Sequence, residues 1–168
     1  MPVIFEDTRN QLKKHELKRS YFEERGWTIE RTKLFVGDYM LPGGLVSIDT
    51  KKDIYELASN MRQQHDRFRR ECERAREAGY ELVVLVENDD GVWDLDALVD
   101  WIEPMDHYMM RKRKSGGNAK RITGTSLYKS CKTMSRKYGV KFAFCPPATA
   151  GYVVLTILEE GKYGPVDA

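Results

Sequence analysis

A Pro-Gly-Gly sequence in the middle of residues 36–51 is the feature that most constrains how this chain folds. Apolar runs flank it on both sides, which predicts two β-strands joined by a tight turn. If the turn is centred on the two glycines, Tyr39 faces Ile48 and Asp38 faces Asp49. Directly opposed side chains on one face of a sheet have Cβ atoms about 5 Å apart. The sequence therefore predicts two carboxylates lying face to face.

Two opposed carboxylates need a cation nearby, because like charges destabilise a sheet and raise the pKa of one of the acids. Lys51 shares the face of Asp49, about 6.6 Å farther along the strand. Mg²⁺ takes oxygen ligands, one or two of them carboxylates and the others water and substrate phosphate. The hairpin thus predicts a Mg²⁺ site formed by Asp38 and Asp49, with the Thr50 carbonyl as a further ligand and Mn²⁺ as a substitute ion.

This arrangement suits metal-assisted hydrolysis of a phosphodiester bond. In that chemistry Lys51 would orient or activate the attacking water, or stabilise charge on the phosphate. The acid-x-Lys triplet alone says little, because it occurs at residues 16–18, 49–51 and 160–162. Its strand context and the aspartate across the turn distinguish the second triplet. The alternative is an exposed hairpin in which Lys51 neutralises two surface aspartates.

A third acid precedes the hairpin. Residues 3–5 form a short apolar run that predicts a buried strand, with Glu6 and Asp7 at its end. If this strand lies beside the hairpin, Asp7 is a further metal ligand and catalytic residue. The alternative role for Asp7 is to cap the N-terminus of a helix that begins near Asn10.

Three motifs occur in a distinctive order along the chain: Asp7-Thr-Arg9, Gly37-Asp38-Tyr39, and Asp49-Thr50-Lys51 before a long helix. This order resembles the nuclease domain of the XPF-type structure-selective endonucleases, within the restriction-endonuclease-like PD-(D/E)xK superfamily. That family's pattern is Asp-x-Arg-Glu, Gly-Asp-Tyr, Glu-Arg-Lys followed by an Asp, and later an Arg with a Gln four residues on. The resemblance spans roughly residues 3–160, and Val83 to Glu87 is similar to the strand and acid that follow in the family.

The chain departs from the family's pattern at its accessory positions. Asn10 stands in place of Glu, Tyr55 in place of the Asp after the lysine, and Glu71 in place of the Gln after Arg67. The resemblance implies that Arg9 and Arg67 bind phosphates and that water attacks to leave a 5′-phosphate and a 3′-hydroxyl. It also implies a role in DNA repair or recombination.

The spacing of apolar residues predicts an α/β fold with a central mixed sheet flanked by helices, similar to the restriction-endonuclease-like core. The clearest helix is predicted over residues 54–78, before a buried strand over 82–86, and this crossover implies a parallel strand pair. The other expected elements are helices over 10–25, 94–102, 125–138 and 150–158 and strands over 27–31 and 140–144.

Length and composition fit one nuclease domain over residues 1–168. No apolar run approaches the roughly 20 residues that span a bilayer, so we expect a cytoplasmic protein with no membrane partner. Cys72, Cys131 and Cys145 are too scattered for a zinc site or a disulfide framework and are expected to be reduced core residues. The tail after Gly161 is expected to be loose.

Charge is unevenly distributed along the chain although the net charge is only +2. Residues 89–106 contain seven acids and no base, whereas residues 111–121 contain bases and no acid. With its two glycines, the basic segment predicts a mobile loop that follows a phosphate backbone, although a merely solvated loop is the alternative. Its candidate DNA-binding residues are Arg111, Lys112, Arg113, Lys114, Lys120 and Arg121.

Together these features predict a Mg²⁺-dependent endonuclease that cuts DNA at branched or distorted structures. The first alternative is a catalytically inactive nuclease fold that serves as a DNA-binding or scaffold subunit, because the accessory positions differ from the family. An RNA endonuclease is a weaker alternative. Dimeric members of the family often carry tandem helix-hairpin-helix motifs after the core. We expect none here, so dimerisation cannot be carried over from the family, and a homodimer stays open as a partner.

Overall fold

The computed structural model describes residues 1–163 and contains one six-stranded mixed sheet. The strand order is β2-β1-β3-β4-β5-β6, in which β1–β2, β4–β5 and β5–β6 are parallel and β1–β3 and β3–β4 are antiparallel. The strands are β1 (Val3–Asp7), β2 (Thr28–Thr32), β3 (Tyr39–Met40), β4 (Val46–Lys51), β5 (Glu81–Glu87) and β6 (Lys141–Cys145).

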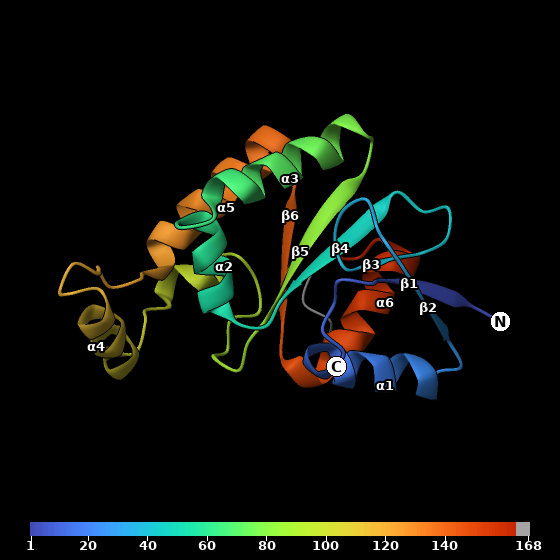
Figure 1. Cartoon of the computed structure of the whole chain (residues 1–168), viewed down its shortest axis with the longest axis horizontal. Coiled ribbons are helices and arrows are strands. Elements are labelled where there is room, and N and C mark those ends of the chain that lie inside the picture. The colour runs from blue at the N-terminus through green and yellow to red at the C-terminus, as the bar shows by residue number, and fades with distance from the viewer. Residues whose placement is uncertain (164–168) are drawn as a thin grey trace.

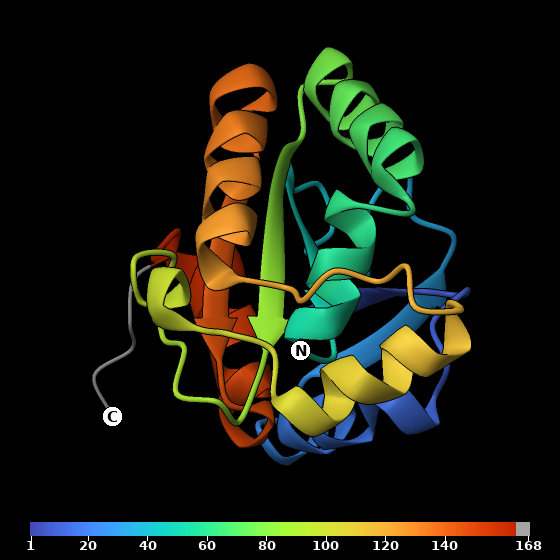
Figure 2. The same ribbon diagram turned by 90° about the vertical axis from the view of Figure 1, so that its left-hand side faces the viewer.

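Helices cover both faces of this sheet, which confirms the predicted α/β class (Figure 1). The helices are α1 (Glu16–Glu24), α2 (Ile54–Met61), α3 (His65–Glu77), α4 (Met105–Lys114), α5 (Gly124–Tyr138) and α6 (Ala150–Glu160). Helices α1 and α6 lie on one face, and α2, α3 and α5 lie on the other (Figures 1 and 2). No helix of the described residues is long and apolar enough to cross a membrane.

Strand β5 shows why the sheet is buried on both faces. Val83 and Leu85 belong to the core under α1 and α6, whereas Leu82, Val84 and Val86 belong to the core under α2, α3 and α5. Side chains alternate along a strand, so a continuous apolar run supplies both cores. The three cysteines are buried and unpaired, as expected.

The predicted hairpin register is confirmed, because Tyr39 pairs with Ile48. The turn lies slightly earlier than the double glycine and spans Leu41–Gly44, where the Gly44 N–H donates to the Leu41 carbonyl at 3.0 Å. Gly43 has φ +73°. Pro at the second position and a positive φ at the third are typical of a type II turn.

The predicted parallel crossover is also correct, since β4 pairs with β5 in parallel. The single helix predicted over residues 54–78 is wrong, however, because it is divided into α2 and α3. The break lies at Arg62, with φ −123° and ψ −78°. Residues 62–67 are all polar. The apolar stripe is therefore interrupted there, and no core contact holds α2 and α3 together as one continuous helix.

Two further predicted elements differ from the structure, and a third lies largely outside the described residues. The first helix begins at Glu16, after a 3₁₀ turn over Lys13–His15, rather than near residue 10. The acidic segment forms only a 3₁₀ turn over Ala97–Asp100 instead of a helix over 94–102. Residues 164–168 of the expected loose tail lie outside the described part of the chain.

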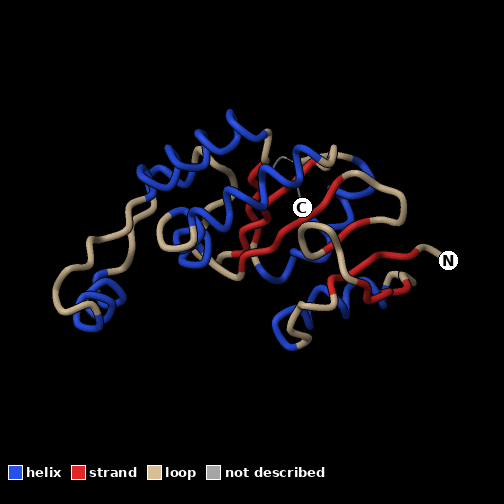
Figure 3. Tube along the Cα trace, turned by 45° about the horizontal axis from the view of Figure 1, so that its top comes forward, coloured by secondary structure: helices blue, strands red, loops and turns tan. Residues whose placement is uncertain are grey.

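The basic segment is not entirely a loop, because its first four residues, Arg111 to Lys114, belong to α4. This helix buries none of its residues and stands apart from the sheet between two loops (Figure 3). Pro104 precedes it, and methionine, arginine and lysine favour helix formation. Without an apolar stripe facing a core, its helical state left no periodic signal in the sequence.

Gly37, before β3, is predicted to be essential for stability. It has φ +76°, and a Cβ there would lie 2.2 Å from Ser47 Oγ and 3.0 Å from the Ile48 carbonyl oxygen. Gly43 is the matched control, because it has φ +73° and open space around it. Gly43→Ala should lower the free energy of unfolding by about 1–2 kcal/mol, the cost of a left-handed non-glycine residue.

Gly37→Ala should lose about 1–3 kcal/mol more than Gly43→Ala, because overpacking adds to the backbone strain. Urea unfolding followed by circular dichroism measures both losses. Equal losses for the two variants would show that the contact with Ser47 does not matter.

Candidate active site

Asp38 and Asp49 lie on the face of the sheet that α2 and α3 cover. Asp38 directly precedes β3, and its N–H donates to the Ile48 carbonyl at 2.7 Å, one residue before the Asp49 that the predicted register places opposite it. The Thr50 N–H and Oγ1 both donate to Asp38 Oδ2 at 2.7 Å. The N–H and C=O of a strand residue point to the same neighbouring strand. The Thr50 carbonyl is therefore directed toward Asp38, as its candidate ligand role requires.

Lys51 forms an ion pair with Asp49, with 2.8 Å between Nζ and Asp49 Oδ2. Both side chains are buried. Asp49 Oδ2 nevertheless makes no hydrogen bond of good geometry in the described structure. The Lys51 ammonium, 2.8 Å away, is therefore the cation that offsets the cost of burying this carboxylate oxygen.

The pKa values follow from this crowding of buried acids. Burial raises the pKa of Asp49 to about 6, the charge of Lys51 opposes that rise, and the charge of Asp38 adds to it. Burial also raises the pKa of Asp38, against the two hydrogen bonds from Thr50. Burial would lower the pKa of Lys51, but the adjacent Asp49 carboxylate more than offsets it, so that the pKa is raised. Lys51 is therefore an ammonium at neutral pH.

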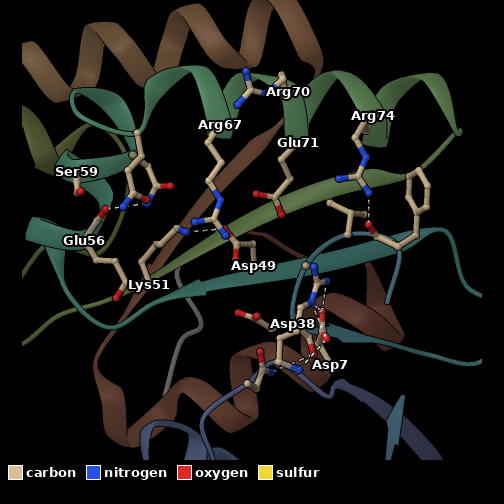
Figure 4. Close-up of a pocket in the computed structure, with 17 residues that line it drawn as sticks. Asp7, Asp38, Asp49, Lys51, Glu56, Ser59, Arg67, Arg70, Glu71 and Arg74 are labelled. Carbon is tan, nitrogen blue, oxygen red and sulfur yellow. Dashed lines mark hydrogen bonds and ion pairs between the residues drawn. The ribbon is translucent and has the colours of Figure 1, made fainter. Parts of the chain in front are cut away.

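A cleft with two adjoining sections, of about 550 and 750 Å³, lies over these residues, and Figure 4 shows the first section. Both sections contain Asp38, Asp49 and Lys51. Three arginines of α3 line the first section, spaced so that they share one side of the helix: Arg67, Arg70 and Arg74. The predicted phosphate-binding residue Arg67 is thus brought to the same cleft as the two acids.

Asp7 lines the same cleft, because β1 lies beside β3 as the metal hypothesis requires. The Asp7 carboxylate is already hydrogen-bonded to Arg9, however. Arg9 Nε donates to Asp7 Oδ1 at 3.0 Å and to Oδ2 at 2.9 Å, and Arg9 Nη2 also pairs with Oδ2. The roles proposed for Asp7 as metal ligand and Arg9 as phosphate ligand therefore compete with each other. Asp7 caps no helix, since the first helical turn begins at Lys13.

Two of the predicted DNA-binding residues in the basic segment 111–121 are also engaged within the protein. Arg111 Nε and Nη2 each donate to the buried Glu103 carboxylate at 2.6 Å. Arg121 Nε donates to the Glu103 carbonyl at 2.8 Å. Four predicted residues of this segment keep some or all of their surface exposed: Lys112, Arg113, Lys114 and Lys120.

Two further acids of the cleft were missed as site residues. Glu71 accepts a hydrogen bond from the Gly37 N–H, and burial together with the charge of Asp49 raises its pKa. The sequence signal for Glu71 was its position one helical turn after Arg67, because residues four apart lie on the same side of a helix. Glu56 lines both sections of the cleft and accepts from Lys14 Nζ at 2.9 Å. Its spacing from Asp53, which caps α2, was the corresponding signal.

No known family model matches this chain, and no curated protein matches it. Within residues 1–163, no group of three or more His, Cys, Asp or Glu side chains is placed to hold a metal ion. The resemblance to XPF-type nucleases stays a prediction.

Asp49 should make stability depend on pH. Its folded-state pKa of about 6 lies above the ordinary value of 3.8, so the folded protein binds this proton more tightly than the unfolded chain. The contribution of Asp49 to stability is therefore full below pH 4 and falls as pH rises through 6. Asp49→Asn cannot ionise and should gain stability relative to the wild type over this window, on the order of 3 kcal/mol.

The measurement is the free energy of unfolding from pH 4 to pH 8 in the presence of a chelator. Asp66→Asn is the control, because Asp66 is solvent-exposed on α3. Parallel pH profiles for wild type and Asp49→Asn would contradict the prediction.

Proposed function

We propose that this protein is a divalent-metal-dependent endonuclease that hydrolyses phosphodiester bonds in DNA, at branched or distorted structures. The observation that carries the proposal is the meeting of Asp38 and Asp49 across one hairpin, with the Lys51 ammonium on Asp49 and arginines on the facing wall of the cleft. This arrangement is consistent with a restriction-endonuclease-like core, and with a role in DNA repair or recombination.

The donor set fits Mg²⁺. Asp49 Oδ2 is a buried oxygen that contacts the Lys51 ammonium at 2.8 Å, and the Asp38 carboxylate lines the same cleft. Magnesium is held by one or two carboxylates and completes its shell with water and substrate phosphate, so two acids suffice. Asp38 and Asp49 would hold the ion, the Thr50 carbonyl would add an oxygen, and Mn²⁺ would bind the same ligands. Asp7 is a poorer candidate because Arg9 already neutralises it.

When bound, the ion supplies Lewis acidity toward the phosphoryl oxygen and lowers the pKa of water. Lys51 acts as a cation rather than as a base, because its pKa is raised. Its ammonium can donate to the attacking water and to a phosphate oxygen. Arg67, from the facing helix, can hold a phosphate through two parallel hydrogen bonds. Water attack on phosphorus then breaks the bond to the 3′ oxygen, leaving a 3′-hydroxyl and a 5′-phosphate.

Substitution of the hairpin residues tests this proposal. Asp49→Asn and Lys51→Ala should each lower the cleavage rate of flap, fork and junction DNA by about 100-fold or more, comparable to losing one preorganised electrostatic contact. Chelation should abolish cleavage in the wild type, and Mn²⁺ should restore it. The assay is gel analysis of labelled DNA under single-turnover conditions, with an RNA version of each substrate as a comparison.

The matched controls come from the last acid-x-Lys triplet. Glu160 and Lys162 form an exposed ion pair at the end of α6, outside the cleft. Glu160→Gln and Lys162→Ala should cut at the wild-type rate. Equal cleavage by all five proteins would rule out this site.

A catalytically inactive DNA-binding or scaffold subunit is the second candidate. The observation that favours it is that both carboxylates already have partners, Lys51 on Asp49 and Thr50 on Asp38. Calorimetric titration with Mn²⁺ separates the two candidates. The nuclease should bind Mn²⁺ with heat that Asp38→Ala abolishes, whereas an inactive module should bind DNA and show no such heat.

A further inference from the structure

A stack of three planar groups lies at one end of the cleft. The Phe35 ring packs on Tyr80, with ring centroids 5.6 Å apart and an interplanar angle of 24°. The Arg74 guanidinium carbon lies 4.8 Å from the Phe35 ring centroid, and Arg74 Nη2 donates to the Phe35 carbonyl at 2.9 Å. Phe35 lines only the smaller section of the cleft, and Arg74 marks that end in Figure 4. We call this set the Phe35 stack.

A second stack lies in the other section. His107 of α4 packs on Tyr55 of α2, with centroids 3.8 Å apart and an interplanar angle of 21°. Trp101 meets Tyr55 edge-on at 5.7 Å. Tyr55 and His107 line only the larger section of the cleft. We call this set the His107 stack.

The proposed catalytic residues lie between the two stacks, because they are shared by both sections. Arg67 and Arg70 line the wall beside the Phe35 stack, and Lys14 lies in the section of the His107 stack. A chain of phosphates that passes over Asp38 and Asp49 would therefore meet cations, with planar side chains before and after them.

Packing between elements accounts for one aromatic residue of each stack, but not for the exposure of Phe35 or the fixed position of His107. Tyr80 and Trp101 are largely or partly buried and serve the core. Phe35, by contrast, remains 46% exposed at the cleft. His107 is held rigidly, since its Nδ1 lies 2.5 Å from Oε2 of the buried Glu103. An exposed aromatic ring and a fixed imidazole are suited to hold a flat ligand.

We propose that the Phe35 stack and the His107 stack are nucleobase-binding sites, and that the cleft takes DNA whose bases are unpaired on both sides of the bond that is cut. This inference rests on the proposed nuclease function. Every base has a π-face, so stacking on aromatic rings or on an arginine plane binds unpaired strands without regard to sequence. Bases inside a duplex already stack on one another, so a continuous duplex cannot use these sites.

The experiment compares a base-bearing oligonucleotide with an abasic one of equal length and charge. The protein is the Asp49→Asn full chain, which binds without cutting, and affinity is measured by fluorescence anisotropy. The base-bearing single strand should bind at least ten-fold more tightly than the abasic strand. Phe35→Ala should weaken binding of the base-bearing strand by about ten-fold, the scale of one lost base–aromatic stack, and should leave the abasic strand unchanged.

His107→Asn provides the same test at the other end, because an amide can still donate to Glu103 while the ring is lost. Tyr152→Ala is the control, since Tyr152 is a 43% exposed aromatic on α6, on the other face of the sheet. It should bind both strands like the parent protein. Thermal melting confirms that each variant is folded.

The outcomes separate this inference from the function on which it rests. If the wild type cuts DNA while base-bearing and abasic strands bind equally, only the stacking sites are overturned. The stacking sites alone are likewise overturned if Phe35→Ala and His107→Asn weaken binding of the base-bearing and the abasic strand equally. If the wild type neither cuts nor binds any DNA, the proposed function fails and the stacking sites fail with it.

Discussion

The register of one short hairpin places two acids, Asp38 and Asp49, against each other in a buried part of the sheet. Burial raises the pKa of both carboxyls, and the charge of Asp38 adds to the rise at Asp49 as that of Glu71 does at Asp38, although Lys51 and Thr50 supply partners. Such a pair lowers stability unless a cation compensates it, so the fold must fix the two strands firmly. The crowded Gly37 and the type II turn at Gly43 do this locally, because each adopts a backbone conformation that few other residues tolerate.

The opposite face of the same strand holds the hairpin in place. Tyr39, next to Asp38, is fully buried against Phe22, and its hydroxyl donates to the buried Glu6 at 3.1 Å. His15 Nδ1 lies 2.8 Å from the same hydroxyl, and burial lowers the pKa of His15 to about 4. The imidazole is therefore neutral at physiological pH and adds no charge beside Glu6. Asp38 faces the cleft from a strand whose next residue is anchored by a satisfied polar network.

The sequence predicted those features that depend on strand periodicity and failed where a tertiary contact decides. The hairpin register, the parallel crossover to β5 and the two-sided burial of residues 82–86 all follow from a period of two. The division of α2 from α3 was hidden, because a polar stretch inside a helix looks like an exposed face. The pairing of Asp7 with Arg9 was also hidden, since both residues match a family motif and the competition between them appears only in three dimensions.

The tertiary structure also moves the expected phosphate-binding charge from the basic segment at residues 111–121 to the arginines of α3. The basic run at residues 111–121 suggested the main phosphate contact. Arg111 instead donates hydrogen bonds to the Glu103 carboxylate, and Arg121 donates one to the Glu103 carbonyl. Burial alone would raise the pKa of Glu103, but the hydrogen bonds that its carboxylate accepts from Arg111, the Ile122 N–H and His107 lower it to about 2. The adjacent acidic segment thus uses part of the basic one to attach α4 beside the cleft. The arginines of α3 line the cleft itself. Because a charge in a cleft acts on bound phosphate with less screening than one on an exposed helix, α3 should dominate the contact at the cleavage site and α4 should contribute longer-range attraction.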